Sequence, residues 1–131
     1  MTTQFEGIRY RTADNWYPII PPQPFASRKI RYLEIGAFYG ANFVTVGKSY
    51  GMHPESELYC IDPWLDYNDY PEYKSKQEDT YSKFLKNIEK FGIKNKTNIR
   101  RGFSNEEIVK FEDDFFDIIY IDGNHEPEYV M

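Results

Sequence analysis

The chain alternates between short apolar runs and longer stretches in which apolar residues recur every three or four positions. The short runs predict β-strands at residues 30–35, 58–61, 97–101 and 115–121. The amphipathic stretches predict helices at residues 41–50, 81–91 and 106–111. This alternation is typical of an α/β fold with a parallel sheet. The last run is apolar on both faces except for Asp117, which favours a buried strand.

Residues 1–28 follow neither pattern. They contain a group of closely spaced prolines: Pro18, Pro21, Pro22 and Pro24. Because proline opposes helix and cannot donate to a strand ladder, we predict an extended arm. Its apolar anchors would be Trp16, Tyr17, Ile19, Ile20 and Phe25. The arm either covers the domain or forms part of a substrate or partner surface, and one α/β domain follows at residues 29–131.

Length and composition narrow the class of protein. A chain of 131 residues fits one domain, and its 18% aromatic content can support a core. No apolar run reaches the roughly 20 residues of a membrane helix, and the polar residues 2–11 lack the apolar centre of a signal peptide. The single cysteine, Cys60, cannot form an internal disulfide, so we expect a reducing compartment, the cytoplasm.

The net charge of −5 is unevenly distributed. Acidic side chains dominate residues 105–131, whereas basic ones gather between Lys83 and Arg101. Lys83, Lys86 and Lys90 recur at helical spacing, so we interpret them as the solvated face of one helix. A nucleic-acid surface would need a basic face with stacking aromatics, and the pattern does not favour one.

Candidate chemistry begins at the end of the first predicted strand, in residues 34–40 (EIGAFYG). Gly36 and Gly40 allow a tight turn and let a ligand approach the backbone, and the next helix begins there. Phe38 breaks the pattern G-x-G-x-x-G, which makes a pyrophosphate site less favoured. The segment is either a ligand-binding turn or only a connection between a strand and a helix.

Asp62 stands at the end of the second predicted strand, and ligands bind at the carboxyl ends of such strands. An acid here can accept both hydroxyls of a ribose, and Trp64 can flank an adenine ring. The alternatives are a turn opened by Asp62 and Pro63, and an indole buried in the core. We interpret Cys60, within the strand, as a small buried apolar residue.

The other two strand ends also carry polar residues. After the third, Ser104 favours a helix N-cap with Glu107 completing a capping box, and a place beside an adenine is its secondary role. After the fourth, Asp122 and His125 offer a carboxylate and an imidazole, which suit a hard divalent cation or a general base. The alternative is a surface histidine, with Asp122 capping a turn.

In this order the motifs resemble those of class I S-adenosylmethionine-dependent methyltransferases. Residues 121–125 (IDGNH) resemble the branch that includes macrocin-type sugar O-methyltransferases. The resemblance covers residues 30–131 and implies a Rossmann-like, doubly wound parallel sheet of seven strands, of which this chain supplies the first four. The cofactor residues that it implies are Glu34, Gly36, Gly40, Asn42, Asp62, Trp64 and Ser104.

The resemblance also assigns each of these residues a role. Gly36 and Gly40 would bracket the methionine part of the cofactor, Glu34 would organise that turn, and Asn42 would reach the cofactor carboxylate. Asp62 would hold the ribose hydroxyls. Trp64 and Ser104 would lie near the adenine.

A metal-assisted transfer is implied as well. Asp122 would bind Mg²⁺ beside the acceptor hydroxyl, lowering its pKa, and His125 would take the proton. The acceptor would be a sugar or another small molecule. A tyrosine-rich segment would either line its pocket or form a covering loop, with Tyr67, Tyr70, Tyr73 and Tyr81 as its members.

The rest of the family's sheet has no counterpart in this sequence, so we expect a homo-oligomer or a partner segment that supplies a C-terminal half. Two other functions remain open. One is a non-catalytic half-domain that binds a cofactor or a partner. The other is an NAD-dependent oxidoreductase, which shares the Rossmann arrangement.

Overall fold

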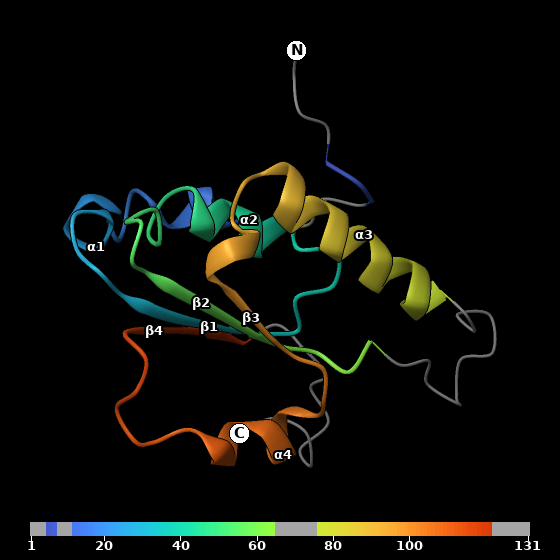
Figure 1. Ribbon diagram of the computed structural model, residues 1–131. Coiled ribbons are helices and arrows are strands. Elements are labelled where there is room, and N and C mark those ends of the chain that lie inside the picture. The colour runs from blue at the N-terminus through green and yellow to red at the C-terminus, as the bar shows by residue number, and fades with distance from the viewer. Residues whose placement is uncertain (1–4, 8–11, 65–75, 122–131) are drawn as a thin grey trace.

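The computed structural model describes residues 5–7, 12–64 and 76–121. Within these residues, one sheet contains four parallel strands in the order β3-β2-β1-β4 (Figure 1). The strands are β1 (Arg31–Ile35), β2 (Glu57–Ile61), β3 (Thr97–Arg100) and β4 (Ile118–Ile121). β4 begins later than predicted because Phe115 and Phe116 pack against a face of the sheet instead of pairing within it. The predicted parallel α/β sheet is confirmed.

Helices cover both faces of the sheet, which is the doubly wound arrangement (Figure 1). α2 (Ala41–Gly47) and α3 (Lys76–Lys90) lie on one face, and α4 (Ser104–Glu107) lies on the other, followed by the 3-10 turn η4 (Ile108–Lys110). A further 3-10 turn, η3 (Lys94–Lys96), leads into β3. Among the helices of the described residues, none is long and apolar enough to cross a membrane.

Two helices differ in length from their predictions. α3 begins at Lys76, before the predicted start at residue 81. The earlier start was not predicted because the first turn is polar and gives no apolar stripe. Glu78 and Asp79 in that turn suit the positive end of the helix dipole. α2 ends at Gly47, before the predicted residue 50. Tyr50 is nevertheless 1% exposed, so its apolar signal came from the core and not from the helix.

The prediction of a wholly extended arm is wrong. Residues 12–28 contain the 3-10 turn η1 (Ala13–Trp16) and the short helix α1 (Gln23–Ala26). Pro22 is the N-cap of α1 and Pro24 lies in its first turn, where a backbone N–H has no intrahelical partner to lose. These prolines therefore begin a helix instead of preventing one.

Aromatic residues anchor the arm on the domain, as predicted. Three rings of the arm lie 5.7, 5.9 and 5.7 Å from the ring of Tyr50, and they belong to Trp16, Tyr17 and Phe25. Ile19 and Ile20 are not anchors, since they are 82% and 48% exposed. Residues 12–28 thus pack on the domain, as the first of the two alternatives expects, and a substrate or partner surface stays a prediction.

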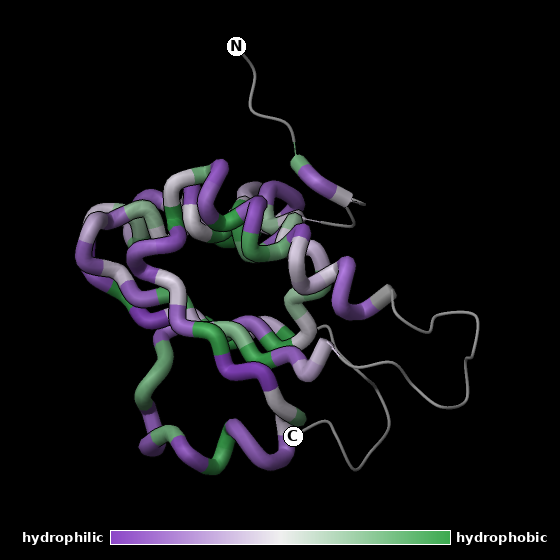
Figure 2. The backbone as a smooth tube through the Cα atoms, turned by 45° about the vertical axis from the view of Figure 1, so that its right-hand side comes forward, coloured by the Kyte–Doolittle hydropathy of each residue, from purple (hydrophilic) through white to green (hydrophobic). Residues whose placement is uncertain are grey.

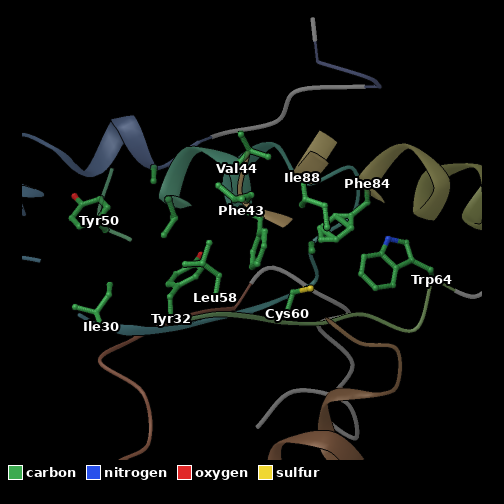
Figure 3. Packing of buried hydrophobic residues seen from close by; sticks show 14 residues of the cluster. Ile30, Tyr32, Phe43, Val44, Tyr50, Leu58, Cys60, Trp64, Phe84 and Ile88 are labelled. Atoms are coloured by element: carbon green, nitrogen blue, oxygen red, sulfur yellow. The ribbon is translucent and has the colours of Figure 1, made fainter. Parts of the chain in front are cut away.

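The main core lies between the sheet and the layer formed by α2, α3 and the arm (Figure 3). Phe43 of α2 is fully buried, with its ring 6.1 Å from that of Tyr32 and 5.6 Å from that of Phe84. Cys60 is a free thiol in this core, and burial raises its pKa well above the usual value, which confirms its apolar role. Figure 2 shows hydrophobic stretches in the sheet and hydrophilic ones toward the periphery.

Candidate cofactor-binding site

The turn between β1 and α2 is the first candidate ligand contact. Gly36 and Gly40 have φ values of 88° and 91°, which glycine adopts without strain. A Cβ on Gly40 would come within 2.9 Å of the Phe84 ring, so glycine is needed there. Gly40 is also the N-cap of α2, and the turn therefore leads directly into the helix.

Residues at the end of β2 hold this turn in place. The Asp62 carboxylate accepts hydrogen bonds from the backbone N–H of Phe38 at 3.1 Å and from that of Trp64 at 2.8 Å. The indole N–H of Trp64 donates to the Phe38 carbonyl at 3.0 Å. Phe38 and Trp64 have φ values of 52° and 45°, which are unfavourable for residues with a side chain. The hydrogen bonds offset this strain and preorganise the turn.

The carboxyl group of Asp62 is nearly enclosed, with 7% of the residue exposed. Burial raises its pKa, while the N–H groups of Trp64, Phe38 and Ala37 and the charge of Arg101 act in the opposite direction. A carboxyl whose pKa is raised by folding favours the folded state at acidic pH, and that contribution is lost as the pH rises through the folded pKa. Asp62 lies where it was predicted and holds the turn, and its contact with a ribose stays a prediction.

Trp64 lies in the core. The residue is 1% exposed, and its ring packs against those of Tyr81 and Phe84 at centroid distances of 4.7 and 5.0 Å. The guanidinium of Arg101 lies 4.2 Å from the centroid of the Tyr81 ring. The structure thus shows the alternative interpretation of Trp64 as a core residue. Contact with an adenine stays a prediction that this burial does not favour.

A buried polar cluster joins β1 to the first turn of α2. Glu34 is 1% exposed and accepts hydrogen bonds from the Tyr32 hydroxyl at 2.6 Å and from the Asn42 amide at 2.8 Å. Burial and the nearby charge of Glu34 raise the pKa of Tyr32 well above its usual value, so the hydroxyl keeps its proton and donates. This cluster ties the two ends of the turn together, in keeping with the organising role expected of Glu34.

Asn42 presents a different atom from the one expected. Its amide nitrogen donates to Glu34 Oε1 at 2.8 Å and to Tyr32 Oη at 3.2 Å. Its Oδ1 is buried and has no hydrogen-bond partner. An oxygen of this kind accepts hydrogen bonds, so it cannot bind the carboxylate of a cofactor and suits an amino group instead. Asn42 remains a candidate site residue, with the hydrogen-bond role reversed.

The first residues after β3 also differ from expectation. Ser104 is the first residue of α4, whose N-cap is Phe103, and no side chain caps this helix end. Glu107 pairs with Lys110 at 2.8 Å, so the predicted capping box does not form. Asn105, which the sequence motifs did not single out, has a buried Oδ1 without a partner. The sequence could have indicated Asn105 only as a polar residue in the first helical turn after a strand.

The structure gathers most of the predicted cofactor residues at one edge of the sheet. Those at the ends of β1 and β2 and on α2 are Glu34, Gly36, Gly40, Asn42, Asp62 and Trp64. Ser104 follows β3, the neighbour of β2, at the same edge. Asp122, His125, Tyr67, Tyr70 and Tyr73 lie outside the described residues. Across residues 5–7, 12–64 and 76–121, no group of three His, Cys, Asp or Glu side chains could hold a metal, and the Mg²⁺ site stays a prediction.

This parallel sheet, with its polar groups at the carboxyl ends of the strands, defines a Rossmann-like domain, a class whose ligands bind at that edge of the sheet. The family described as "Methyltransferase domain" matches residues 33–131, from within β1 to beyond the end of β4. The chain belongs to this family. A comparison with curated proteins found no match.

Solved structures with the same fold include cofactor-bound Rv0187 from MTB, with a TM-score of 0.62 and 16% identity. They also include the O-methyltransferase TomG from Streptomyces achromogenes in complex with SAM (0.62, 15%) and an O-methyltransferase from Bacillus cereus in complex with SAH (0.58, 17%). The matches cover 90%, 88% and 91% of this chain but 47%, 46% and 48% of those chains. The likeness concerns the Rossmann-like fold, and this chain spans a little under half the length of these proteins.

Proposed function

We propose that the chain is the cofactor-binding part of an S-adenosylmethionine-dependent methyltransferase that acts on a hydroxyl of a sugar or another small molecule. The observation that carries this proposal is the edge of β1 and β2, where Asp62 fixes the glycine turn and Asn42, in the first turn of the helix that follows, has an unpartnered acceptor. The match of the methyltransferase domain over residues 33–131 supports it. TomG and the Bacillus cereus protein, with the same fold, are complexes with SAM and SAH.

The described residues fit this cofactor by the groups they offer. S-adenosylmethionine carries an amino group on its methionine part and another on its adenine, and both donate hydrogen bonds. In the described part of the chain, two buried acceptors lack partners, Asn42 Oδ1 and Asn105 Oδ1, and they follow β1 and β3. Asp62 already accepts backbone hydrogen bonds, but its two carboxylate oxygens have four lone pairs in all, which leaves room to accept a ribose hydroxyl.

When bound, the cofactor supplies an electrophilic methyl group on a sulfonium. The protein would contribute alignment of the acceptor and removal of its proton. In this proposal a ring nitrogen of His125 accepts the proton of the acceptor hydroxyl, since imidazole titrates near neutral pH. Asp122 would hold a Mg²⁺ ion, whose chemistry is to lower the pKa of that hydroxyl.

Titration calorimetry with S-adenosylmethionine, S-adenosylhomocysteine and NAD tests the cofactor. We expect the first two to bind and NAD to bind more weakly. Asp62→Ala should weaken S-adenosylhomocysteine binding about tenfold or more, roughly 1.4 kcal/mol, because it removes the ribose acceptor and releases the turn. Glu57→Gln, at the opposite end of β2, is the matched control and should leave binding unchanged. Tighter binding of NAD would contradict the methyltransferase proposal.

Methyl transfer to a panel of sugars and other small hydroxyl compounds, with and without Mg²⁺, tests the chemistry. His125→Ala should preserve cofactor binding and lower turnover by roughly a hundredfold or more, which is the usual contribution of a general base. Asp122→Asn should lower turnover and weaken its dependence on Mg²⁺. Unchanged turnover in His125→Ala would show that another group removes the proton.

The second candidate function is a non-catalytic half-domain that binds a cofactor or a partner. The exposed edge strand β4 favours it, because Ile119 and Ile121 are 51% and 39% exposed there and offer a surface for a partner. In that case the chain would bind S-adenosylhomocysteine but transfer no methyl group unless a complementary segment is supplied. Under either function we propose a cytoplasmic protein that assembles as a homo-oligomer or with such a segment, which light scattering of the purified protein can measure.

A further inference from the structure

Three residues near the N-terminus lie against α3 and the glycine turn, although both of these are distant from them in sequence (Figure 1). We call residues 5–7 the N-terminal strap. The backbone N–H of Glu6 donates to Asn87 Oδ1 at 2.7 Å, and Asn87 Nδ2 donates back to the Glu6 carbonyl at 2.8 Å. The same nitrogen donates to the Tyr39 carbonyl in the turn, also at 2.8 Å. One side chain therefore holds both the strap and the turn.

Asn87 is unusual for its place on α3. Its exposed fraction is 0%, and its neighbour Ile88 belongs to the main core. A buried amide is unfavourable unless it is hydrogen-bonded, and here both the oxygen and the nitrogen have backbone partners. Apolar residues would satisfy the core equally well, so the amide is explained by what it connects.

Other contacts give the strap a defined position. Gly7 has a φ of 93°, and a Cβ there would lie 2.2 Å from the ring of Tyr39. Glu6 forms an ion pair with Lys90 at 3.4 Å, and the ring of Phe5 lies 6.4 Å from that of Phe91. Only a strap that passes closely over Tyr39 meets all these conditions.

We propose that Asn87 is a positioning residue that couples the N-terminal strap to the cofactor turn. Tyr39 lies between Phe38, whose backbone is fixed by Asp62 and Trp64, and Gly40, which begins α2. A docked strap therefore stabilises the turn conformation that receives the cofactor, and a bound cofactor stabilises the docked strap, because such coupling is reciprocal. The second half of this statement rests on the proposed function, whereas the first half concerns the protein without ligand.

Gly7→Ala is the test variant, because it unseats the strap while leaving Asn87 in place. Gly92→Ala is the matched control, since Gly92 also has a positive φ, 75°, but an added Cβ there would meet nothing within 4 Å. Hydrogen exchange of residues 37–40, measured without ligand by mass spectrometry, should become about fivefold faster in Gly7→Ala, which is at the lower end of typical coupling between sites. It should be unchanged in Gly92→Ala. Equal exchange in the two variants would overturn the proposal.

Calorimetry with S-adenosylhomocysteine tests the coupling to the cofactor. Gly7→Ala should bind it about five- to tenfold more weakly than the wild type, and the ligand should slow exchange of residues 5–7 in the wild type. Unchanged affinity in Gly7→Ala would overturn the coupling. If the wild type does not bind the ligand, the proposed function fails, and the exchange measurement without ligand still decides whether the strap holds the turn.

Asn87→Leu tests the residue itself. Leucine has the same branched side chain of four heavy atoms and a higher helix propensity than asparagine, but it removes the three hydrogen bonds. We expect faster exchange in both residues 5–7 and residues 37–40, with the helix content of the folded protein retained by circular dichroism. Protection of both segments at the wild-type level would overturn the role of Asn87, and Gly7→Ala keeps the proposal testable if Asn87→Leu does not fold.

Discussion

Tyr32 and Leu33 are neighbours in β1, yet they enter two differently built layers. Tyr32 faces α2 and α3, where the main core surrounds it and Glu34 and Asn42 bond to it. Leu33 faces the other way, into a smaller cluster with Ile35 that aromatic side chains cover. The first face thus combines a large core with a polar cluster, whereas the second is built mainly from aliphatic side chains and aromatic rings.

The second face is closed by rings and cations more than by helices. Three phenylalanines pack around Tyr59 at centroid distances of 5.5, 5.6 and 5.3 Å: Phe111, Phe115 and Phe116. The guanidinium of Arg31 lies 4.3 Å from the centroid of the Phe115 ring at its margin. The cover stops before β4, where Ile119 and Ile121 are 51% and 39% exposed. Stability and ligand binding are therefore expected to depend on the first face far more than on the edge of the second.

Phe43→Ala tests whether the first face contributes the larger share of the free energy of unfolding. The side chain is fully buried against Tyr32 and Phe84, so its loss should lower the free energy of unfolding by about 3–5 kcal/mol. Urea denaturation followed by far-UV circular dichroism measures this. A loss below about 1 kcal/mol would mean that the core between α2 and the sheet is not the main source of stability.

The pH dependence of unfolding tests how much the polar contacts of Glu57 stabilise the second face. Glu57 accepts hydrogen bonds from Arg31 at 2.9 Å and from the Tyr59 hydroxyl at 3.1 Å, and the bond from Arg31 is the main cause of its lowered pKa. A carboxylate with a pKa lowered by folding adds stability above its unfolded pKa, and that stability is lost as the pH falls through the folded pKa. The wild type should therefore lose more stability than Glu57→Gln between about pH 5 and 3.

The size of this effect should be small. One third of the Glu57 side chain is exposed, at 33%, and solvent screens pairs of this kind to about 1 kcal/mol or less. Urea denaturation of both proteins across that pH range measures the difference. If the free energy of unfolding changed equally with pH in both proteins, Glu57 would not contribute to the stability of this face.

Ile119→Thr should have the smallest effect, within about 0.5 kcal/mol, because the side chain is half exposed at the uncovered edge. Leu33→Ala is the comparison on the same face, since Leu33 pairs with Ile119 and is fully buried, and it should cost about 2–5 kcal/mol. Similar losses in the two variants would show that the edge is covered in solution and that the contrast within this face is wrong.

Periodicity predicted what depends on local sequence. The four strands, the parallel sheet and the glycine turn all follow from short apolar runs and from Gly36 and Gly40. The arm was misjudged because a proline at a helix start cannot be told from one that breaks a helix without knowing where the helix begins. The start of α3 was missed because its first turn carries no apolar stripe.

The site was predicted by position but not in its hydrogen bonds. Asp62 and Asn42 lie at the expected strand and helix ends, yet their partners are chosen by the fold around them. The Asn42 amide turns inward because Glu34 and Tyr32 offer it acceptors on the neighbouring strand. Asn105 offered only its place in the first helical turn after a strand, and Asn87 gave no signal, since an isolated asparagine in a helical stretch is ordinary unless its tertiary contacts are known. The ends of strands thus predict which residues belong to the site, whereas the hydrogen bond that each atom forms depends on the packing around it.

The N-terminal strap also has a consequence for the order of folding. Glu6 and Asn87 are 81 residues apart in sequence, so their hydrogen bonds close a very long loop. The strap packs against Asn87 of α3 and the ring of Tyr39, which follows β1. It can therefore dock only after β1 and α3 have packed together. The entropy of closing such a loop must be met before the contacts stabilise it. Residues 5–7 are synthesised before β1 and α3, but they would accordingly reach their native place after them.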